Sequence, residues 1–553
     1  MTRLALLLAA GIPLVVVGHA AARANEAGAP VPARYDVSVR VQPDARRLEL
    51  SGTVQLPAVD TTRAQIVFRL NPRISDFRVD WTEPGKHTGN AITLQLLSTD
   101  SVTTKRAVRP AKAIPPNTPV ALHFSAIGSG DFAQLYYVGP EVAFGSAWGA
   151  EWYPVLQGDR DRCVGTLNVT VPPGWSVVTG GARRSTETEE RAGTFRVAVD
   201  DPTYFTFLAG PYITVRHGGA VPLSAHLLTQ RDNMPNWLDG TERMLEVLVA
   251  EFGPYAFDSL AVVEVPRDIA QRAGFNAFSA QGVLALNHRA FGVPDTKLLL
   301  EWLGHELSHQ WYPHIVQFDT PPGYFMEEAM AEYGGLRIVE TIGGPEAATR
   351  LRRTGYEYDP IYSALAYFRL VGAGVDAPIG NLEPRESSRN LAYTKGALVL
   401  DMLSRELGPD TMRRVLNDIS RRHGLRRVPW PTFLEEIERG AGRDLNWFYE
   451  QWFHRTGAPD FALTWKQEGD QLLGRITQPA PFYRANLSAE ARGPGSAEKA
   501  THVVTIDGTS VDFAMHVPFR VTRVELDPAY EILRWTPEYR AAADSVRSVA
   551  SGK

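Results

Sequence analysis

The stretch Trp302-Leu-Gly-His-Glu-Leu-Ser-His-Gln-Trp311 decides how this chain is interpreted, because it holds two histidines four residues apart and a glutamate directly after the first. On a helix, residues four apart share one face and lie about 6 Å apart along the axis. The imidazoles of His305 and His309 can therefore bind one Zn²⁺ together. Glu306 can reach a metal-bound water without binding the metal itself, so the pattern predicts it as general base.

A third metal ligand is needed, since a catalytic zinc is held by three protein ligands and keeps one position open for water. Glu328 follows His309 after eighteen residues, in a second helical segment, and supplies this carboxylate. Glu332 lies four residues further on the same face, where it can accept the second ring N–H of a ligand histidine. A solvated helix acid explains Glu332 equally well. Glu327 is the weaker ligand candidate, because its side chain points about 100° away.

The region around these residues has the periodicity of a mainly helical domain, predicted to span 216–458. The metal-binding helix is expected over 298–311, with Asp295 or Thr296 as its N-cap and Pro313 just past its end. A strand is expected at 260–265. Further helices are expected at 237–252, 326–340, 345–353, 393–407, 409–423 and 431–440.

Regions with alternating apolar and polar residues flank the helical domain on both sides. Residues 25–215 contain short strand patterns such as 35–41, 48–56 and 64–70, separated by turn clusters, which predicts a β-sandwich or saddle-like domain. Residues 459–553 again read as strands and are enough for one small β domain. The predicted fold class is therefore multidomain α+β.

Bulk composition narrows the class of protein. The chain has 553 residues, and domains of about 100–200 residues make three of them a reasonable expectation. The net charge, 57 − 62 = −5, gives no reason to expect nucleic acid or an anionic membrane as partner. Cys163 is the only cysteine, so no intramolecular disulfide is possible, and a small buried hydrophobic role suits it better than nucleophilic catalysis.

Residues 1–24 have the pattern of a signal peptide. Arg3 precedes an apolar run over 4–17, and Ala22-Arg23-Ala24 offers a cleavage motif that places the mature start near Asn25. The run is short for a transmembrane helix, although an uncleaved N-terminal anchor is the alternative. The protein is expected to be exported, to the periplasm or the medium, with no stable membrane insertion after cleavage.

Four short motifs carry a family resemblance: HELSHQW at 305–311, MEEAMA at 326–331, YTKG at 393–396, and FYEQW at 448–452, followed by Gly457 and Pro459. The first three resemble the HExxHQW, LNEGFA and YxKG motifs of the aminopeptidase N (membrane alanyl aminopeptidase) and leukotriene hydrolase family, which belongs to the gluzincin metallopeptidases. The fourth resembles the end of that family's catalytic domain. The resemblance is specific over about 250–460 and looser over 33–215.

The resemblance implies a peptide or protein substrate, a Zn²⁺ cofactor and a thermolysin-like catalytic domain between two β domains. In the family, the tyrosine of YxKG donates a hydrogen bond to the developing oxyanion. Tyr393 takes that role here by resemblance. The alternative for Tyr393 is an ordinary residue at the start of an amphipathic helix.

One stretch departs from the family pattern. The family carries GAMEN on a strand that binds the substrate backbone, and the glutamate of this motif pairs with the substrate's N-terminal ammonium group. Here residues 276–284 read NAFSAQGVL. Aligning Gly282 with the glycine of the family's PGL places Ser279 at the glutamate position. The expected substrate-binding residues are Ala277, Phe278, Ser279 and Gly282.

A neutral serine cannot offset the cost of desolvating an ammonium group. Either another acid serves, with Glu264, Asp268 and Glu327 as candidates, or free N-termini are not selected. The expected function is an aminopeptidase-like zinc metallopeptidase. The alternatives are an endopeptidase or another zinc hydrolase without free-amine selectivity, such as the epoxide hydrolysis of one branch of the family, and a non-catalytic exported binding module. The intact Glu306 argues against the binding module.

Overall fold

The structure is a computed structural model of the chain. The residues that it describes are 32–82, 89–90, 92–146, 149–157, 162–181, 184–185, 193–292, 302–318, 323–355, 363–382, 386–495 and 497–550.

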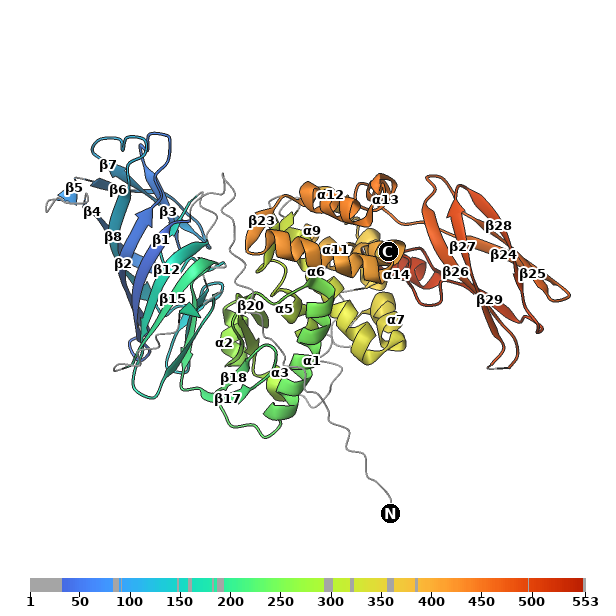
Figure 1. Ribbon diagram of the computed structural model, residues 1–553, viewed down its shortest axis with the longest axis horizontal. Helices are drawn as coiled ribbons and strands as arrows, with labels where there is room; N and C mark the ends of the chain where they lie inside the picture. The colour runs from blue at the N-terminus through green and yellow to red at the C-terminus, as the bar shows by residue number, and fades with distance from the viewer. Residues whose placement is uncertain are drawn as a thin grey trace, which may run out of the picture.

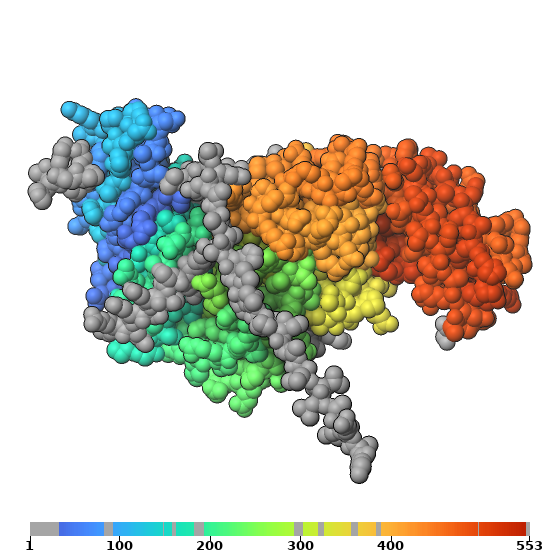
Figure 2. All heavy atoms as spheres, in the orientation of Figure 1, coloured from blue at the N-terminus to red at the C-terminus, as the bar shows by residue number. Residues whose placement is uncertain are grey.

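Three parts lie in a row along the long axis of the molecule (Figure 1). A β-rich part is followed by a mainly helical part, and a smaller β part lies at the other end. In the space-filling view, the green to orange atoms of the helical part separate the blue and cyan atoms from the red ones (Figure 2). This is the mixed α+β organisation that the sequence predicts.

The described residues of the N-terminal part form three sheets rather than a simple pair. Strands such as Arg34–Gln42 and Val120–Ser129 alternate buried and more exposed side chains, as the sequence pattern predicts for a sheet with one face in a core, whereas Tyr136–Val138, Ala143–Ser146 and Thr206–Gly210 are buried throughout. The largest sheet has the order β14 (Arg184–Ser185), β15 (Thr194–Thr203), β12 (Cys163–Thr170), β1 (Arg34–Gln42), β2 (Arg47–Leu56), β8 (Val120–Ser129), β4 (Ile74–Thr82), β5 (Gly89–Asn90). The second has the order β13 (Ser176–Thr179), β16 (Thr206–Gly210), β10 (Ala143–Ser146), β9 (Tyr136–Val138). The third has the order β11 (Val155–Leu156), β3 (Ile66–Leu70), β7 (Thr104–Pro110), β6 (Ile92–Thr99).

A five-stranded sheet joins the N-terminal part to the helices. Its order is β17 (Ile213–His217), β18 (Leu223–Leu227), β19 (Leu260–Val265), β21 (Val283–Asn287), β20 (Ala277–Ala280). Alternate residues of β19 belong to different cores: Leu260 and Val262 pack with the helices, whereas Ala261 and Val263 pack with the N-terminal β strands. Burial on both faces explains the continuous apolar run of this strand.

The domain boundary expected between residues 215 and 216 does not coincide with a break between elements in the structure. It falls inside β17, which pairs with β18 in the five-stranded sheet. The pattern at 204–215 reads as one strand, but the chain leaves β16 and turns at residues 211–212 before β17 begins. Pairing partners, which the sequence does not display, decide to which sheet each half belongs.

The helical part surrounds the predicted site. Its helices are α1 (Met234–Phe252), α2 (Arg267–Arg272), α3 (Arg289–Gly292), α5 (Gly304–Ser308), α6 (Gly323–Ile338), α7 (Pro345–Thr354), α8 (Ala364–Gly372), α9 (Glu386–Leu391), α10 (Ala397–Leu407), α11 (Pro409–His423), α12 (Trp430–Ala441) and α13 (Asn446–Trp452). The described residues of this part also include the π-helical turns Val339–Gly343 and Ala392–Gly396, the 3-10 helix Ile379–Asn381, and the short parallel pair β22 (Val316–Phe318) and β23 (Arg426–Val428). Residues 293–301, with the expected N-cap and the start of the metal-binding helix, lie outside the described residues.

The C-terminal part is a small β unit followed by a helix. Its two sheets have the orders β24 (Ala462–Glu468), β25 (Gln471–Thr477), β28 (Ser510–His516), and β27 (Lys499–Asp507), β26 (Arg484–Arg492), β29 (Arg523–Leu526). The final helix α14 (Pro537–Ala550) packs back on α8, where the rings of Tyr539 and Phe368 stack with centroids 4.9 Å apart. The sequence analysis expected a β domain over 459–553. The structure differs, because the helix α14 follows the last strand and packs on the helical part.

Within the part of the chain that the structure describes, no helix is long and apolar enough to span a membrane. The predicted signal peptide, residues 1–24, lies outside the described residues.

Candidate active site

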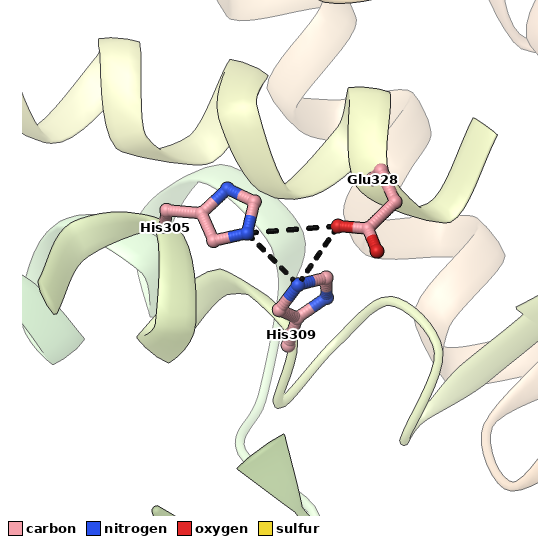
Figure 3. A group of neighbouring side chains, drawn as sticks. All are labelled: His305, His309 and Glu328. Carbon is pink, nitrogen blue, oxygen red and sulfur yellow. Dashed lines mark hydrogen bonds and ion pairs between the residues drawn. The ribbon is translucent and has the colours of Figure 1, made fainter. Parts of the chain in front are cut away.

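Two helices bring the three predicted metal ligands together (Figure 3). His305 lies on α5, His309 directly follows its end, and Glu328 lies on α6. The Nε2 atoms of the two histidines are 3.0 Å apart. Glu328 Oε2 lies 3.2 Å from His309 Nε2 and 3.6 Å from His305 Nε2. One ligand atom from each residue thus lies within 4.8 Å of the other two.

The helix α5 ends at Ser308, yet His309 keeps helical backbone angles, with φ −60° and ψ −19°. Its N–H still donates to the carbonyl of His305, at 3.3 Å. The four-residue spacing therefore retains its helical geometry through the last turn, and both imidazoles remain on the face that meets α6.

The outer nitrogen of each imidazole has its own acceptor. His305 Nδ1 lies 2.7 Å from Glu332 Oε1, and His309 Nδ1 lies 2.8 Å from the carbonyl oxygen of Tyr312. Donation from Nδ1 leaves the Nε2 lone pairs facing Glu328 Oε2. Three electron-pair donors at such short separations repel one another unless a cation lies between them. This arrangement fits a divalent metal with nitrogen and oxygen ligands, as zinc prefers.

Burial and charge shift the pKa values of the site in opposite directions. Burial alone would lower the pKa of His309, but the neighbouring Glu328 carboxylate outweighs it and raises the pKa to about 9. Burial would raise the pKa of Glu328, yet the two histidines bring it down to about 2. The pKa of Glu306 is raised by burial, although both histidines oppose the change. A buried carboxylate with a raised pKa suits a residue that must accept and return a proton.

Tyr393 lies beside the ligands in the π-helical turn Ala392–Gly396, not at the start of a regular helix. Its ring centroid is 5.7 Å from that of His305. The hydroxyl accepts hydrogen bonds from Arg389 Nη2 at 3.0 Å and Nε at 3.3 Å. Single π-helical turns recur at functional sites, and this one places the predicted oxyanion donor next to the metal ligands.

The expected substrate strand is β20, the edge strand of the five-stranded sheet. Gln310, the residue after His309, ties this strand to the metal-binding helix. Its Nε2 donates to Ser279 Oγ at 2.7 Å and to the Ala280 carbonyl at 2.9 Å, while its Oε1 accepts the Gly282 N–H at 2.9 Å. Ala277 and Phe278 lie on the same strand. Gln310 thus positions this edge strand, although it was not among the predicted site residues. Its place in the HELSHQW motif was the sequence feature that could have indicated this role.

The three candidate substitutes for the missing acid lie in different surroundings. Glu264 is buried, accepts the Leu228 N–H at 2.8 Å and pairs with Arg231 at 2.6 Å. Asp268 is exposed in the first turn of α2. Burial raises the pKa of Glu327 to about 8, and its carboxyl group accepts the backbone N–H of Phe318 at 2.8 Å. Glu264 and Glu327 are thus already engaged by protein groups.

Proteins that are similar in sequence to this chain support the interpretation of this site. Residues 237–452 match the peptidase family M1 domain. The chain is 23% identical over 389 residues to aminopeptidase N of Streptomyces lividans, covering 65% of this chain and 42% of that protein. It is 20% identical over 364 residues to the tricorn protease-interacting factor F2 of Thermoplasma volcanium, covering 62% and 43%. Human aminopeptidase RNPEPL1 is 21% identical over 389 residues, covering 63% and 50%.

The chain spans half or less of the length of these three relatives. The matched region nevertheless contains every predicted metal ligand, Glu306 and Tyr393. The resemblance to the aminopeptidase N family is therefore confirmed by residues 237–452, which match the peptidase family M1 domain.

Proposed function

We propose that this protein is a zinc-dependent metallopeptidase that hydrolyses peptide bonds in the manner of an aminopeptidase. The observation that carries the proposal is the convergence of His305, His309 and Glu328 beside a buried Glu306. The names of the relatives, several of them aminopeptidases, support the same reaction class. The likeness to the family also supports a thermolysin-like fold for the catalytic domain.

Zinc, when held by these three ligands, supplies a polarised scissile carbonyl and an acidified water. The side chains of the chain perform the remaining steps. Glu306 accepts the proton of the attacking water and returns it to the leaving amine. Tyr393 donates a hydrogen bond to the oxygen that becomes negatively charged. Glu332 holds the ring of His305 in the tautomer that presents Nε2 to the metal.

Metal analysis combined with Glu306→Gln tests this proposal. The purified, undialysed protein should contain one zinc per chain, and a chelator should abolish peptide hydrolysis. Glu306→Gln should keep the zinc and lose about 10²–10⁴ in kcat, because the base is lost while the ligands stay. Glu328→Gln, the matched control at a ligand, should lose the zinc as well. Substantially less than one zinc in the wild type would show that the ligand assignment is wrong, and zinc without turnover would favour the binding module.

A second candidate is the same hydrolysis with weak selectivity for a free α-amine, as in an endopeptidase. Ser279 favours it, because its hydroxyl already accepts a hydrogen bond from Gln310 and carries no charge for an ammonium group. Two of the three alternative acids are occupied, Glu264 by Arg231 and Glu327 by the Phe318 backbone. The family likeness supports amine selectivity, so the two candidates make opposite predictions.

Matched peptides with free and acetylated N-termini separate these candidates. An enzyme with weak selectivity for a free α-amine should give kcat/KM values that differ by less than about tenfold, or ~1.4 kcal/mol of transition-state binding. An enzyme with an amine anchor should prefer the free peptide far more strongly, since burying an unpaired ammonium group is costly. Sequencing of the products then shows whether cleavage starts at the N-terminus. A large preference for the free amine would direct attention to Asp268, Glu264 and Glu327.

A further inference from the structure

The guanidinium group of Arg389 contacts two different parts of the candidate active site. Its Nη2 atom donates to the hydroxyl of Tyr393 at 3.0 Å and lies 3.5 Å from Glu328 Oε1. Its Nε atom lies 3.3 Å from the same hydroxyl. Arg389 therefore links the phenol expected to stabilise the oxyanion to a carboxylate expected to bind the metal.

The contact to Tyr393 has a defined direction. Arginine carries five N–H donors and no acceptor, so the phenol oxygen must accept. A hydroxyl has one proton, and with Arg389 on its lone-pair side this proton points away from the guanidinium. Arg389 and Tyr393 are four residues apart, on α9 and in the following π-helical turn, so the pairing is built into the local backbone.

The contact to Glu328 also separates the two oxygens of that carboxylate. Oε1 faces Arg389, whereas Oε2 faces the Nε2 atoms of His305 and His309. A cation on one oxygen and a metal site on the other hold the carboxylate in an orientation that offers a single oxygen to the metal. Partners of this kind orient metal ligands, and their removal typically weakens metal binding by about 10–100-fold.

We propose that Arg389 is a positioning residue that orients the Tyr393 hydroxyl and the Glu328 carboxylate at the same time. This inference rests on the proposed zinc peptidase function. The side chain of Arg389 is 57% exposed, so its removal opens no cavity in the core. An ordinary surface ion pair with such exposure contributes little, and its loss would leave both catalysis and metal binding unchanged.

A double-mutant cycle tests the contact to Tyr393. Arg389→Met keeps an unbranched side chain of the length of the arginine stem and removes every N–H donor. It should lower kcat at least tenfold with little change in KM when Tyr393 is present, and less than twofold in the Tyr393→Phe background, because the group that it positions is already gone. Equal losses in both backgrounds would overturn the proposal.

Zinc competition with a chelator tests the contact to Glu328 without measuring activity. Arg389→Met should weaken zinc binding about tenfold, whereas Tyr393→Phe should leave it unchanged. An unchanged zinc affinity in Arg389→Met would also overturn the proposal. Arg369→Met, at an exposed arginine of α8, is the matched control and should change neither quantity. Zinc content and turnover of the wild type report separately on the proposed function.

Discussion

At the scale of single residues, the orientation of each imidazole depends on a partner outside the metal-binding motif. Glu332 accepts from His305, and its spacing from Glu328 made this role predictable. The partner of His309 is the backbone carbonyl of Tyr312. Every residue type carries such a carbonyl, so the sequence does not indicate this partner. One imidazole is therefore oriented by a side chain that its sequence spacing predicts, and the other by a backbone carbonyl.

Replacing Tyr393 by phenylalanine is expected to lower kcat by about 10²–10³, because it removes one hydrogen-bond donor to the oxyanion. Zinc content should stay at one per chain, since Tyr393 is not a ligand. Steady-state kinetics and metal analysis check both expectations. Tyr137→Phe, which removes a remote hydroxyl beside Glu141, is the matched control. Near-wild-type turnover in Tyr393→Phe would remove the hydroxyl from the mechanism.

At the scale of elements, the geometry of the candidate metal site depends on how closely α5 approaches α6. The two helices meet at Gly334, where an added Cβ would lie 2.8 Å from Ser308 Cβ and 2.8 Å from Phe252 Cε2. Real side chains do not tolerate such distances, and Ser308 is held by a hydrogen bond to the Gly304 carbonyl at 2.7 Å. A glycine inside α6 thus sets the separation of the helices that carry the ligands.

Gly334→Ala is therefore expected to destabilise the protein by about 1–3 kcal/mol and to weaken zinc binding, because the helices must move apart. Urea unfolding of the metal-free protein and zinc competition measure the two effects. Gly240→Ala on α1 is the matched control, since an added Cβ there meets no atom within 4 Å. It should be neutral or slightly stabilising. Wild-type stability and zinc affinity in Gly334→Ala would contradict the close packing of α5 on α6.

At the scale of the whole molecule, the N-terminal part touches the loop that follows the metal-binding helix. Arg162 is buried and donates to the carbonyl oxygens of Pro313 at 2.8 Å and His314 at 3.3 Å. The five-stranded sheet lies between the two cores and packs against both. The helical part therefore shares buried surface with the N-terminal part along this sheet.

Export is a prediction about the whole molecule that the structure does not test. Cleavage near Asn25 would leave all described strands intact, since β1 begins at Arg34. N-terminal sequencing of protein recovered from the periplasm or medium should return a start near Asn25. A start before His19 would instead favour an uncleaved anchor.

The candidate metal ligands, the candidate general base and the three-part order could all be predicted from the sequence alone, because each follows from short-range patterns. The spacing of His305 and His309 is a property of one helix, and the alternation of strands is a property of each strand. The YxKG motif likewise pointed to Tyr393 through resemblance alone.

Which distant groups meet became known from the folded structure. The return of α14 to α8 and the contacts of Gln310 with β20 join segments far apart in the chain, and the place of β17 in the five-stranded sheet depends on its pairing with β18. Arg389 is close in sequence to Tyr393, yet its second contact, with Glu328, spans two helices. Such contacts depend on packing and strand pairing, whose energies are summed over the whole fold and leave no local pattern in the sequence.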